Sequence, residues 1–210
     1  MRTVLCYGDS NTWGYEPATG DRFPEDVRWP GVLAIELGNG FRVIEEALNG
    51  RTTVREDPVE ENKSGKVYLR PCLESHAPLD LVIIALGVND LKARFFASAS
   101  DAADGAGVLV SIAQHSGVGP GGSQPAVLLV APPPAGRLTE LAAMFAGAEE
   151  KSKEFAYQYR RVAEKHGCEL LDAGELVRSS DLDGIHLEAD EHRKLGEAVA
   201  SLAREAAGGS

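Results

Sequence analysis

Short apolar runs alternate along this chain with longer segments of helical hydrophobic period, and this alternation is the feature that most restricts its fold. Runs rich in Val, Ile and Leu, separated by helical segments, are typical of βαβ units that build a parallel sheet. Several of the runs are apolar on both faces, as strands covered by two helical layers must be. The predicted strands are Thr3–Tyr7, Phe41–Glu45, Leu79–Leu86, Ala126–Ala131 and Glu169–Asp172.

The helical segments complete a three-layer arrangement. Phe155, Tyr159 and Val162 fall at i, i+4 and i+7, on one face of a helix, and a closing helix repeats this spacing. Helices are predicted at Trp29–Leu37, Asp101–Gln114, Glu149–Lys165 and about Ala189–Ala206. The expected fold class is therefore α/β, a three-layer α/β/α sandwich around a five-stranded parallel sheet.

No repeat and no Pro/Ser-rich linker divides the chain, so residues 1–210 are expected to form a single domain. The Gly/Pro-rich stretches Gly117–Pro125 and Ala131–Gly136 flank the fourth strand and are predicted to be loops. The segment Arg51–Cys72 has little periodicity and several charges. It is interpreted as a long excursion over the surface or as a contact in an oligomer.

Composition excludes several classes of function. The chain has 21 Lys+Arg against 32 Asp+Glu, a formal charge of −11, which disfavours nucleic-acid and anionic-membrane partners. No apolar run approaches the roughly 18 residues of a membrane helix, and the apolar stretch at the start is too short for a signal peptide. Cys6, Cys72 and Cys168 are widely spaced without a CxxC, so neither a disulfide framework nor a zinc site is indicated. A soluble, cytoplasmic protein is expected.

Polar residues follow the predicted strands, where ligands bind in open parallel sheets. Gly8-Asp9-Ser10 comes after the first strand, Asn49-Gly50 after the second and Gly87-Val88-Asn89-Asp90 after the third. Asp183-Gly184-Ile185-His186 precedes the final helix. Because these segments meet at one edge of the sheet, they are expected to form one site.

The residue types at this edge suit nucleophilic catalysis. A serine hydroxyl needs a base within hydrogen-bond reach and a third group that orients the base. Ser10 is the candidate nucleophile, His186 the candidate base and Asp183 its partner. The candidate oxyanion hole consists of the backbone N–H groups of Ser10 and Gly50 and the side-chain amide of Asn89.

These four stretches, in this order, resemble the sequence blocks of the SGNH hydrolase superfamily, also called GDSL esterases. GDSNTWGY, DVRWPGVL, NGRTT and DGIH are further similar to its bacterial arylesterase/acyltransferase (perhydrolase-like) branch. The resemblance implies a flavodoxin-like fold and a serine esterase that forms an acyl-enzyme on Ser10 without cofactor or metal. Short acyl groups, and transfer of the acyl group to an alcohol or to hydrogen peroxide, are implied by the same branch. Gly117–Gln124 differs from it, which leaves the entrance shape open.

Other interpretations of the same residues exist. Ser10 and Asn89 could merely cap turns, and Asp9 is better explained as a structural residue of its turn than as a second base. Asp181 could compete with Asp183, although the DxxH spacing favours Asp183. The remaining histidines, His76, His115, His166 and His192, have no partner pattern, and no His/Cys/Asp/Glu group has metal-ligand spacing. Trp13 is expected at the pocket wall and Lys92 at its rim.

Alternative functions remain at this stage. A carbohydrate O-acetyl esterase or a thioesterase would use the same Ser-His-Asp machinery with a small-molecule ester or thioester. A non-catalytic binding module or a flavin-type nucleotide binder could share the topology. A homo-oligomer is expected from the Arg51–Cys72 segment and from the resemblance.

Overall fold

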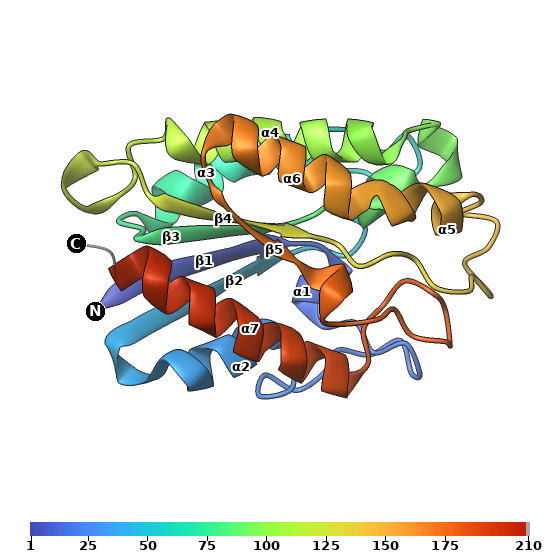
Figure 1. Ribbon diagram of the computed structural model, residues 1–210, viewed down its shortest axis with the longest axis horizontal. Helices are drawn as coiled ribbons and strands as arrows, with labels where there is room; N and C mark the ends of the chain where they lie inside the picture. Colours follow the sequence, from blue (N-terminus) through green and yellow to red (C-terminus); the bar gives the residue numbers. More distant parts are fainter. Residues whose placement is uncertain (209–210) are drawn as a thin grey trace.

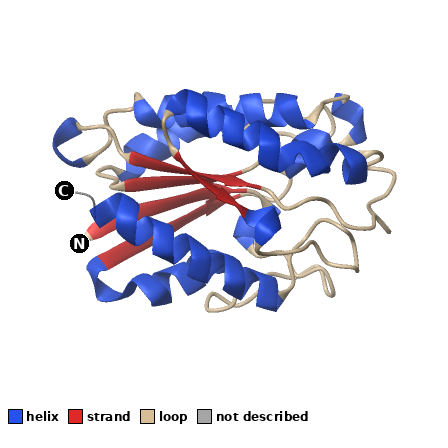
Figure 2. Cartoon of the chain, viewed as in Figure 1, coloured by secondary structure: helices blue, strands red, loops and turns tan. Residues whose placement is uncertain are grey.

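A parallel five-stranded sheet forms the middle layer of the molecule in the computed structural model, which describes residues 1–208 (Figures 1 and 2). The strands are β1 (Arg2–Gly8), β2 (Phe41–Ala47), β3 (Leu81–Ala85), β4 (Ala126–Ala131) and β5 (Glu169–Asp172). Their order is β2-β1-β3-β4-β5. Val4 of β1 pairs with Val43 on one side and with Leu81 on the other. This is the flavodoxin-like order, in which the chain reverses its direction of winding between β1 and β3.

Helices cover both faces of the sheet (Figure 1). One layer holds α3 (Gly65–His76), α4 (Ala99–Gln114) and α6 (Phe155–His166), and the other holds α2 (Trp29–Leu37) and α7 (Ala189–Gly208). The short helices are α1 (Ser10–Trp13) and α5 (Ala148–Lys151). Single 3-10 turns are η1 (Gly38–Gly40), η2 (Val88–Leu91), η3 (Ala93–Phe95), η4 (Pro120–Gly122), η5 (Ser152–Glu154) and η6 (Ala173–Glu175). The predicted three-layer α/β/α class is confirmed.

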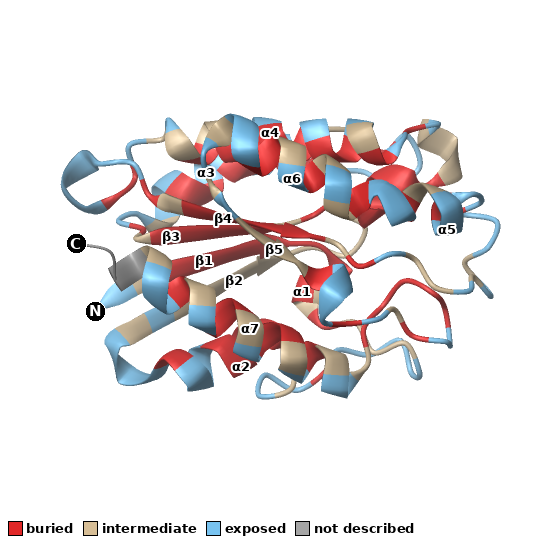
Figure 3. Ribbon diagram, viewed as in Figure 1, coloured by how far each residue is buried: buried red, intermediate tan, exposed pale blue. Residues whose placement is uncertain are grey.

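The core consists of two apolar clusters, one on each face of the sheet (Figure 3). Successive strand residues point to opposite faces, so in β1 Leu5 and Tyr7 pack under α3, α4 and α6, whereas Val4 and Cys6 pack against α2 and α7. All four of these side chains are fully buried. The prediction that these strands are buried on both faces is therefore confirmed. Cys6 packs in the core beneath the turn that carries Ser10.

Two predicted elements differ in the structure. The helix expected at Glu149–Lys165 is divided into α5, η5 and α6. The interpretation of Arg51–Cys72 as a surface excursion is wrong for its second half, because Gly65–His76 forms α3 with Leu69, Cys72 and Leu73 fully buried. These three residues have helical spacing, but Pro71 lies among them, and an interior proline is a strong signal against a helix.

The described helices include none that is both long enough and apolar enough to cross a lipid bilayer.

Candidate active site

The candidate residues gather at the carboxyl edge of the sheet, beside the point where the winding reverses. Ser10 follows β1, Gly50 follows β2 and Asn89 lies in η2, just after β3. All three line one cavity together with His186. The position agrees with the rule that open parallel sheets bind ligands at a switch point.

The turn that carries Ser10 depends on a glycine and an aspartate. A Cβ at Gly8 would lie 1.9 Å from Oγ1 of Thr12, so only glycine lets the chain turn this tightly into α1. The Asp9 carboxylate caps α1 by accepting a hydrogen bond from the Asn11 N–H at 3.0 Å. Asp9 therefore has the structural role expected of it, and Ser10 begins the helix with its hydroxyl on the cavity.

Ser10, His186 and Asp183 form one continuous hydrogen-bonded chain. The distance from Ser10 Oγ to His186 Nε2 is 3.0 Å, and that from His186 Nδ1 to Asp183 Oδ2 is 2.6 Å. The other carboxylate oxygen of Asp183 accepts the backbone N–H groups of Ile185 and His186 at 2.8 and 2.9 Å. Asp183 thus holds His186 both by its imidazole ring and by its backbone N–H. An imidazole oriented in this way can remove a proton from a serine hydroxyl.

Asn11 joins the serine turn to the histidine segment, a role that the sequence analysis missed. Its Nδ2 donates to the Ile185 carbonyl at 3.2 Å, and its Oδ1 accepts the Leu187 N–H at 3.0 Å. The two bonds bracket His186 across 174 to 176 residues of sequence. The sequence shows an asparagine directly after GDS, but nothing in it indicates that this side chain binds the backbone on either side of His186.

The candidate oxyanion donors Gly50 and Asn89 line the same cavity as Ser10. Gly50 has a φ of +78°, a left-handed conformation that favours glycine. Asn89 is 4% exposed, and its Nδ2 lies 3.4 Å from Oδ2 of Asp9. That contact uses one of the two amide hydrogens and leaves the other for a ligand.

Asp90 and Arg51 tie the loops of the site together. Asp90 is fully buried and accepts hydrogen bonds from the Thr53 N–H at 2.9 Å and from the Thr53 hydroxyl at 2.6 Å. Arg51 Nη1 donates to the Gly8 carbonyl at 2.9 Å and to the Glu46 carbonyl at 2.6 Å. The loop after β2 is therefore fixed to the loops after β1 and β3, which sets the position of Gly50.

The pKa values of the site carboxyl groups shift in different directions, although burial raises each of them. Burial raises the pKa of Asp9 to about 6, against the hydrogen bond from Asn11, and it raises the pKa of Asp90 to about 6, against the bonds from Thr53. Burial also acts on Asp183, but the hydrogen bonds and the charge of His186 lower the pKa of Asp183 below its ordinary value. Of these three carboxyl groups, Asp183 is thus the one that stays ionised most readily.

The pKa of Asp9 predicts a pH dependence of stability. An unfolded aspartate titrates near 4, so between about pH 4 and 6 the folded chain holds a proton that the unfolded chain has released. The contribution of Asp9 to the free energy of unfolding should therefore fall as the pH rises through this window. Asp90 contributes a fall of the same sign, whereas His192, whose pKa burial lowers to about 4, contributes a rise. The Asp9 contribution is therefore expected in the difference between wild type and Asp9→Asn, which should shrink as the pH rises from about 4 to 6. Urea denaturation at a series of pH values measures the free energy of unfolding. The control variant is Asp26→Asn, which changes an exposed aspartate. An unchanged profile in Asp9→Asn would contradict the assignment.

The cavity over Ser10 has a volume of about 230 Å³ and is lined by apolar and by polar side chains. The polar wall is defined here as Asn49, Glu60 and Lys92, and the apolar wall as the apolar lining residues. Lys92 is 2% exposed, and its ammonium group contacts Asp57 at 3.2 Å and Glu60 at 2.8 Å, so it lies within the wall rather than at the rim. The apolar wall consists of Leu141, Met144, Phe145 and Ile185.

Tyr15, which sequence reasoning did not select, occupies the place expected for Trp13. The Tyr15 ring lies on the His186 imidazole with centroids 4.1 Å apart, and it lines the cavity. Trp13 is not among the lining residues, and its ring instead contacts the guanidinium of Arg22 at 5.0 Å. Because α1 ends at Trp13 and Gly14 turns the chain in a left-handed conformation, the residue after that turn faces the site.

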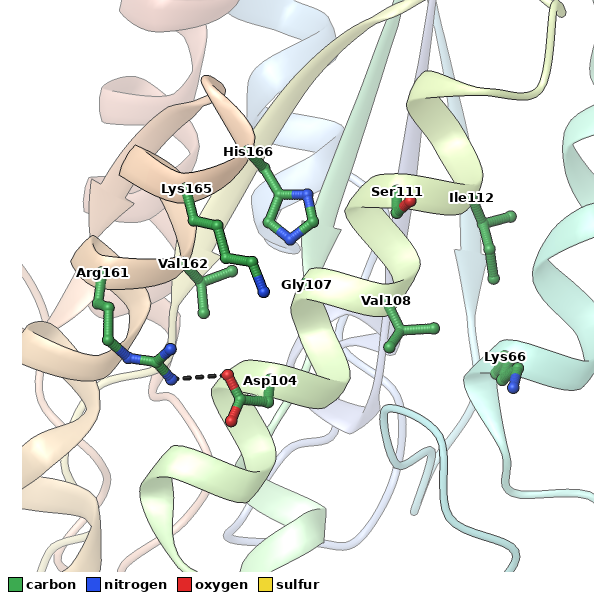
Figure 4. A pocket seen from close by; sticks show the side chains of 10 residues that line it. All are labelled: Lys66, Asp104, Gly107, Val108, Ser111, Ile112, Arg161, Val162, Lys165 and His166. Carbon is green, nitrogen blue, oxygen red and sulfur yellow. Dashed lines mark hydrogen bonds and ion pairs between the residues drawn. The ribbon is translucent and has the colours of Figure 1, made fainter.

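A larger hollow of about 620 Å³ lies elsewhere, between α3, α4 and α6 (Figure 4). Its lining includes Ser111, His166 and the ion pair between Arg161 and Asp104. In Figure 4 Ser111 and His166 project from different helices, α4 and α6, and lie apart. The larger volume therefore does not make this hollow the better candidate, because the hydrogen-bonded chain of serine, histidine and aspartate lies at Ser10.

A serine, an imidazole and a carboxylate joined in this order form the arrangement that serine hydrolases use. The model of the GDSL-like lipase/acylhydrolase family matches residues 6–194, and the chain belongs to this family. Among curated proteins, no sequence matches the chain.

Solved structures give a finer comparison. The aryl esterase of M. smegmatis is 42% identical with a TM-score of 0.94, and the match covers 98% of this chain and 99% of that one. A carbohydrate acetylesterase from Sinorhizobium meliloti is 40% identical, with the same coverage and TM-score. A lipolytic protein of the G-D-S-L family from Veillonella parvula is 14% identical over 97% of this chain and 100% of that one, with a TM-score of 0.67, and shares the fold. With the family match, these likenesses support a carboxylic ester hydrolase.

Proposed function

We propose that this chain hydrolyses carboxylic esters of short acyl groups through an acyl-enzyme on Ser10. The observation that carries the proposal is the continuous hydrogen-bonded chain from Ser10 Oγ through His186 to Asp183, at distances of 3.0 and 2.6 Å. The family match and the likeness to an aryl esterase support the same reaction class.

The proposed reaction has two halves. In the first, Ser10 Oγ attacks the ester carbonyl while His186 Nε2 takes its proton, and His186 then gives that proton to the departing alcohol. In the second, water loses a proton to His186 and attacks the acyl-enzyme, and the proton returns to Ser10 as the acid leaves. Asp183 stabilises the imidazolium that forms in each half.

Negative charge appears on the carbonyl oxygen in both halves. The backbone N–H groups of Ser10 and Gly50 and the free amide hydrogen of Asn89 are proposed to hold this oxygen. Asp9 acts as a positioning residue for Asn89, since its carboxylate accepts the other amide hydrogen at 3.4 Å.

The size of the cavity supports a small acyl group. About 230 Å³ is small among ligand pockets, and the buried side chains of Phe145 and Ile185 limit its apolar side. We expect kcat/KM for p-nitrophenyl acetate to exceed that for p-nitrophenyl octanoate by at least about tenfold, the discrimination that one poorly fitted methylene can already produce. Equal or faster hydrolysis of the octanoate would contradict the preference and leave the mechanism intact.

A carbohydrate O-acetyl esterase is the second candidate. The polar wall of Asn49, Glu60 and Lys92 offers donors and acceptors that a sugar hydroxyl could use. The carbohydrate acetylesterase of S. meliloti also belongs among the similar structures. Acetate release from an acetylated sugar, compared with phenyl acetate under the same conditions, distinguishes the two, because an arylesterase should prefer the phenyl ester.

Acyl transfer is proposed as a side reaction of the same intermediate. An alcohol or hydrogen peroxide can replace water in the second half without any new catalytic group. Adding methanol to a p-nitrophenyl acetate reaction should then yield methyl acetate beside acetate. Acetate as the single product at high methanol would restrict the chain to hydrolysis.

The contact between the Tyr15 and His186 rings, tilted by 32°, predicts an effect on turnover. An aromatic face stabilises a cation, so the imidazolium formed during the reaction should be favoured by the Tyr15 ring. Tyr15→Leu is expected to lower kcat by about 3- to 30-fold, with Tyr15→Phe close to wild type, because the ring supplies the effect. Steady-state kinetics over pH checks this. A loss in KM alone, or an equal loss in Tyr15→Phe, would contradict a role of the ring face.

We also propose that the chain forms a homo-oligomer and that it is located in the cytoplasm. Val59 and Phe96, which are 71% and 91% exposed, are the side chains we expect an interface to cover. A monomeric mass by light scattering would contradict the homo-oligomer. The free state of Cys6, Cys72 and Cys168 is compatible with a cytoplasmic protein, which fractionation of the producing cells would test.

A further inference from the structure

A group of three potential metal ligands lies outside the active-site cavity, between β2 and α3. Glu46 Oε1 is 2.7 Å from His76 Nε2, and Cys72 Sγ completes a set whose ligand atoms all lie within 4.8 Å of one another. Cys72 and His76 are four residues apart on α3, so they share one face of the helix. Spacing in the sequence does not indicate this group, because its third member comes from a distant strand.

We propose that Glu46, Cys72 and His76 bind a Zn²⁺ ion. Thiolate, imidazole and carboxylate are the three ligand types that zinc uses in proteins, and the soft sulfur disfavours Mg²⁺ and Ca²⁺. With three protein ligands, the fourth tetrahedral position is left for water.

The spacing suits tetrahedral coordination after small side-chain movements. Zinc–ligand bonds of about 2.0 to 2.3 Å at the tetrahedral angle place ligand atoms roughly 3.3 to 3.6 Å apart. The Glu46–His76 pair, now at 2.7 Å, must open by less than about 1 Å. The sulfur, within 4.8 Å, must approach by at most about 1.5 Å. Rotation about side-chain bonds covers movements of this size.

The charges of the proposed ligands can balance that of the ion. Zinc binds cysteine as the thiolate, so binding displaces the thiol proton, and the thiolate and Glu46 together neutralise the two charges of the ion. The nearby Arg51 guanidinium, held over the Tyr7 ring at 4.3 Å, opposes the ion, and the three ligands must outweigh this repulsion.

The ion can reach the group from solvent. Cys72 is fully buried, but the side chains of His76 and Glu46 are 25% and 22% exposed. The proposed entry is therefore between His76 and Glu46, whose contact would open to admit the ion to the sulfur. The competing interpretation is a surface ion pair beside an ordinary core cysteine, and it predicts no thiolate bond to metal.

The test uses Co²⁺ as a spectroscopic probe and Zn²⁺ in calorimetry, on the full chain after chelator treatment. Wild type should bind one ion per chain and show the thiolate-to-cobalt charge-transfer band, which only a sulfur ligand produces. Cys72→Ala should lose the band, and His76→Ala should weaken Zn²⁺ binding by at least about 100-fold, the upper end of what outer-shell partners alone cost. His76 is partly exposed, so this second variant should fold if Cys72→Ala does not.

Matched controls are Cys168→Ser and His115→Ala, which remove the same residue types elsewhere. Both should bind Zn²⁺ as wild type does. Absence of the band in wild type, its survival in Cys72→Ala, or its loss in Cys168→Ser would each overturn the proposal. None of these readouts depends on ester hydrolysis, so the result is independent of the proposed function.

Discussion

Ser10→Ala is expected to lower kcat/KM for p-nitrophenyl acetate by at least about 10⁴-fold. The substitution removes the single oxygen that lies 3.0 Å from His186 Nε2, and water cannot reproduce the position of that oxygen. The oxyanion donors remain, so a residual rate above that of the buffer is expected.

The matched control for this experiment is Ser123→Ala. Ser123 is an exposed serine in the loop before β4, and it should retain full activity. Thermal unfolding of both variants checks that they fold. Ser10→Ala with the activity of wild type would contradict an acyl-enzyme at this residue.

Asp183→Asn is expected to lower kcat by about 10⁴-fold while the fold stays intact. The asparagine Oδ1 can still accept the N–H groups of Ile185 and His186, so the segment keeps its shape. Its amide, however, would face His186 Nδ1 as a donor. The imidazole would then carry its proton on Nε2, where it cannot accept the proton of Ser10.

Asp181→Asn is the matched control for the carboxylate. Asp181 is exposed and lies two residues before Asp183, so it tests whether the DxxH spacing selects the correct aspartate. The variant should have kinetics close to those of wild type. A large loss in Asp181→Asn with little change in Asp183→Asn would reverse the assignment.

The fold could be predicted because its main signal is local. An apolar run such as that of β4 indicates burial on both faces, and strands in sequence alternation with helices have few ways to pack. Helix α3 was the exception, since Pro71 masks the spacing of Leu69, Cys72 and Leu73. Its buried face depends on contact with the sheet rather than on helix propensity.

The candidate site could be predicted where its residues lie in short motifs of characteristic spacing. Ser10, Asp183 and His186 each lie in a stretch whose spacing already indicates a role. Tyr15 contacts the His186 ring, and Asn11 binds the backbone beside His186. His186 is more than 170 residues away from both in sequence, so only the folded chain shows these contacts. Trp13 was misplaced because the left-handed turn at Gly14 decides which aromatic residue faces the cavity.

Labelling with a fluorophosphonate, followed by intact-mass measurement and peptide mapping, tests the central claim most directly. The reagent phosphonylates a serine only where a base activates the hydroxyl and donors hold the oxyanion. One adduct per chain, on Ser10, absent from Ser10→Ala and greatly slowed in His186→Ala, is the predicted result. An adduct on another residue, or no adduct on a folded chain that still hydrolyses p-nitrophenyl acetate, would contradict the mechanism.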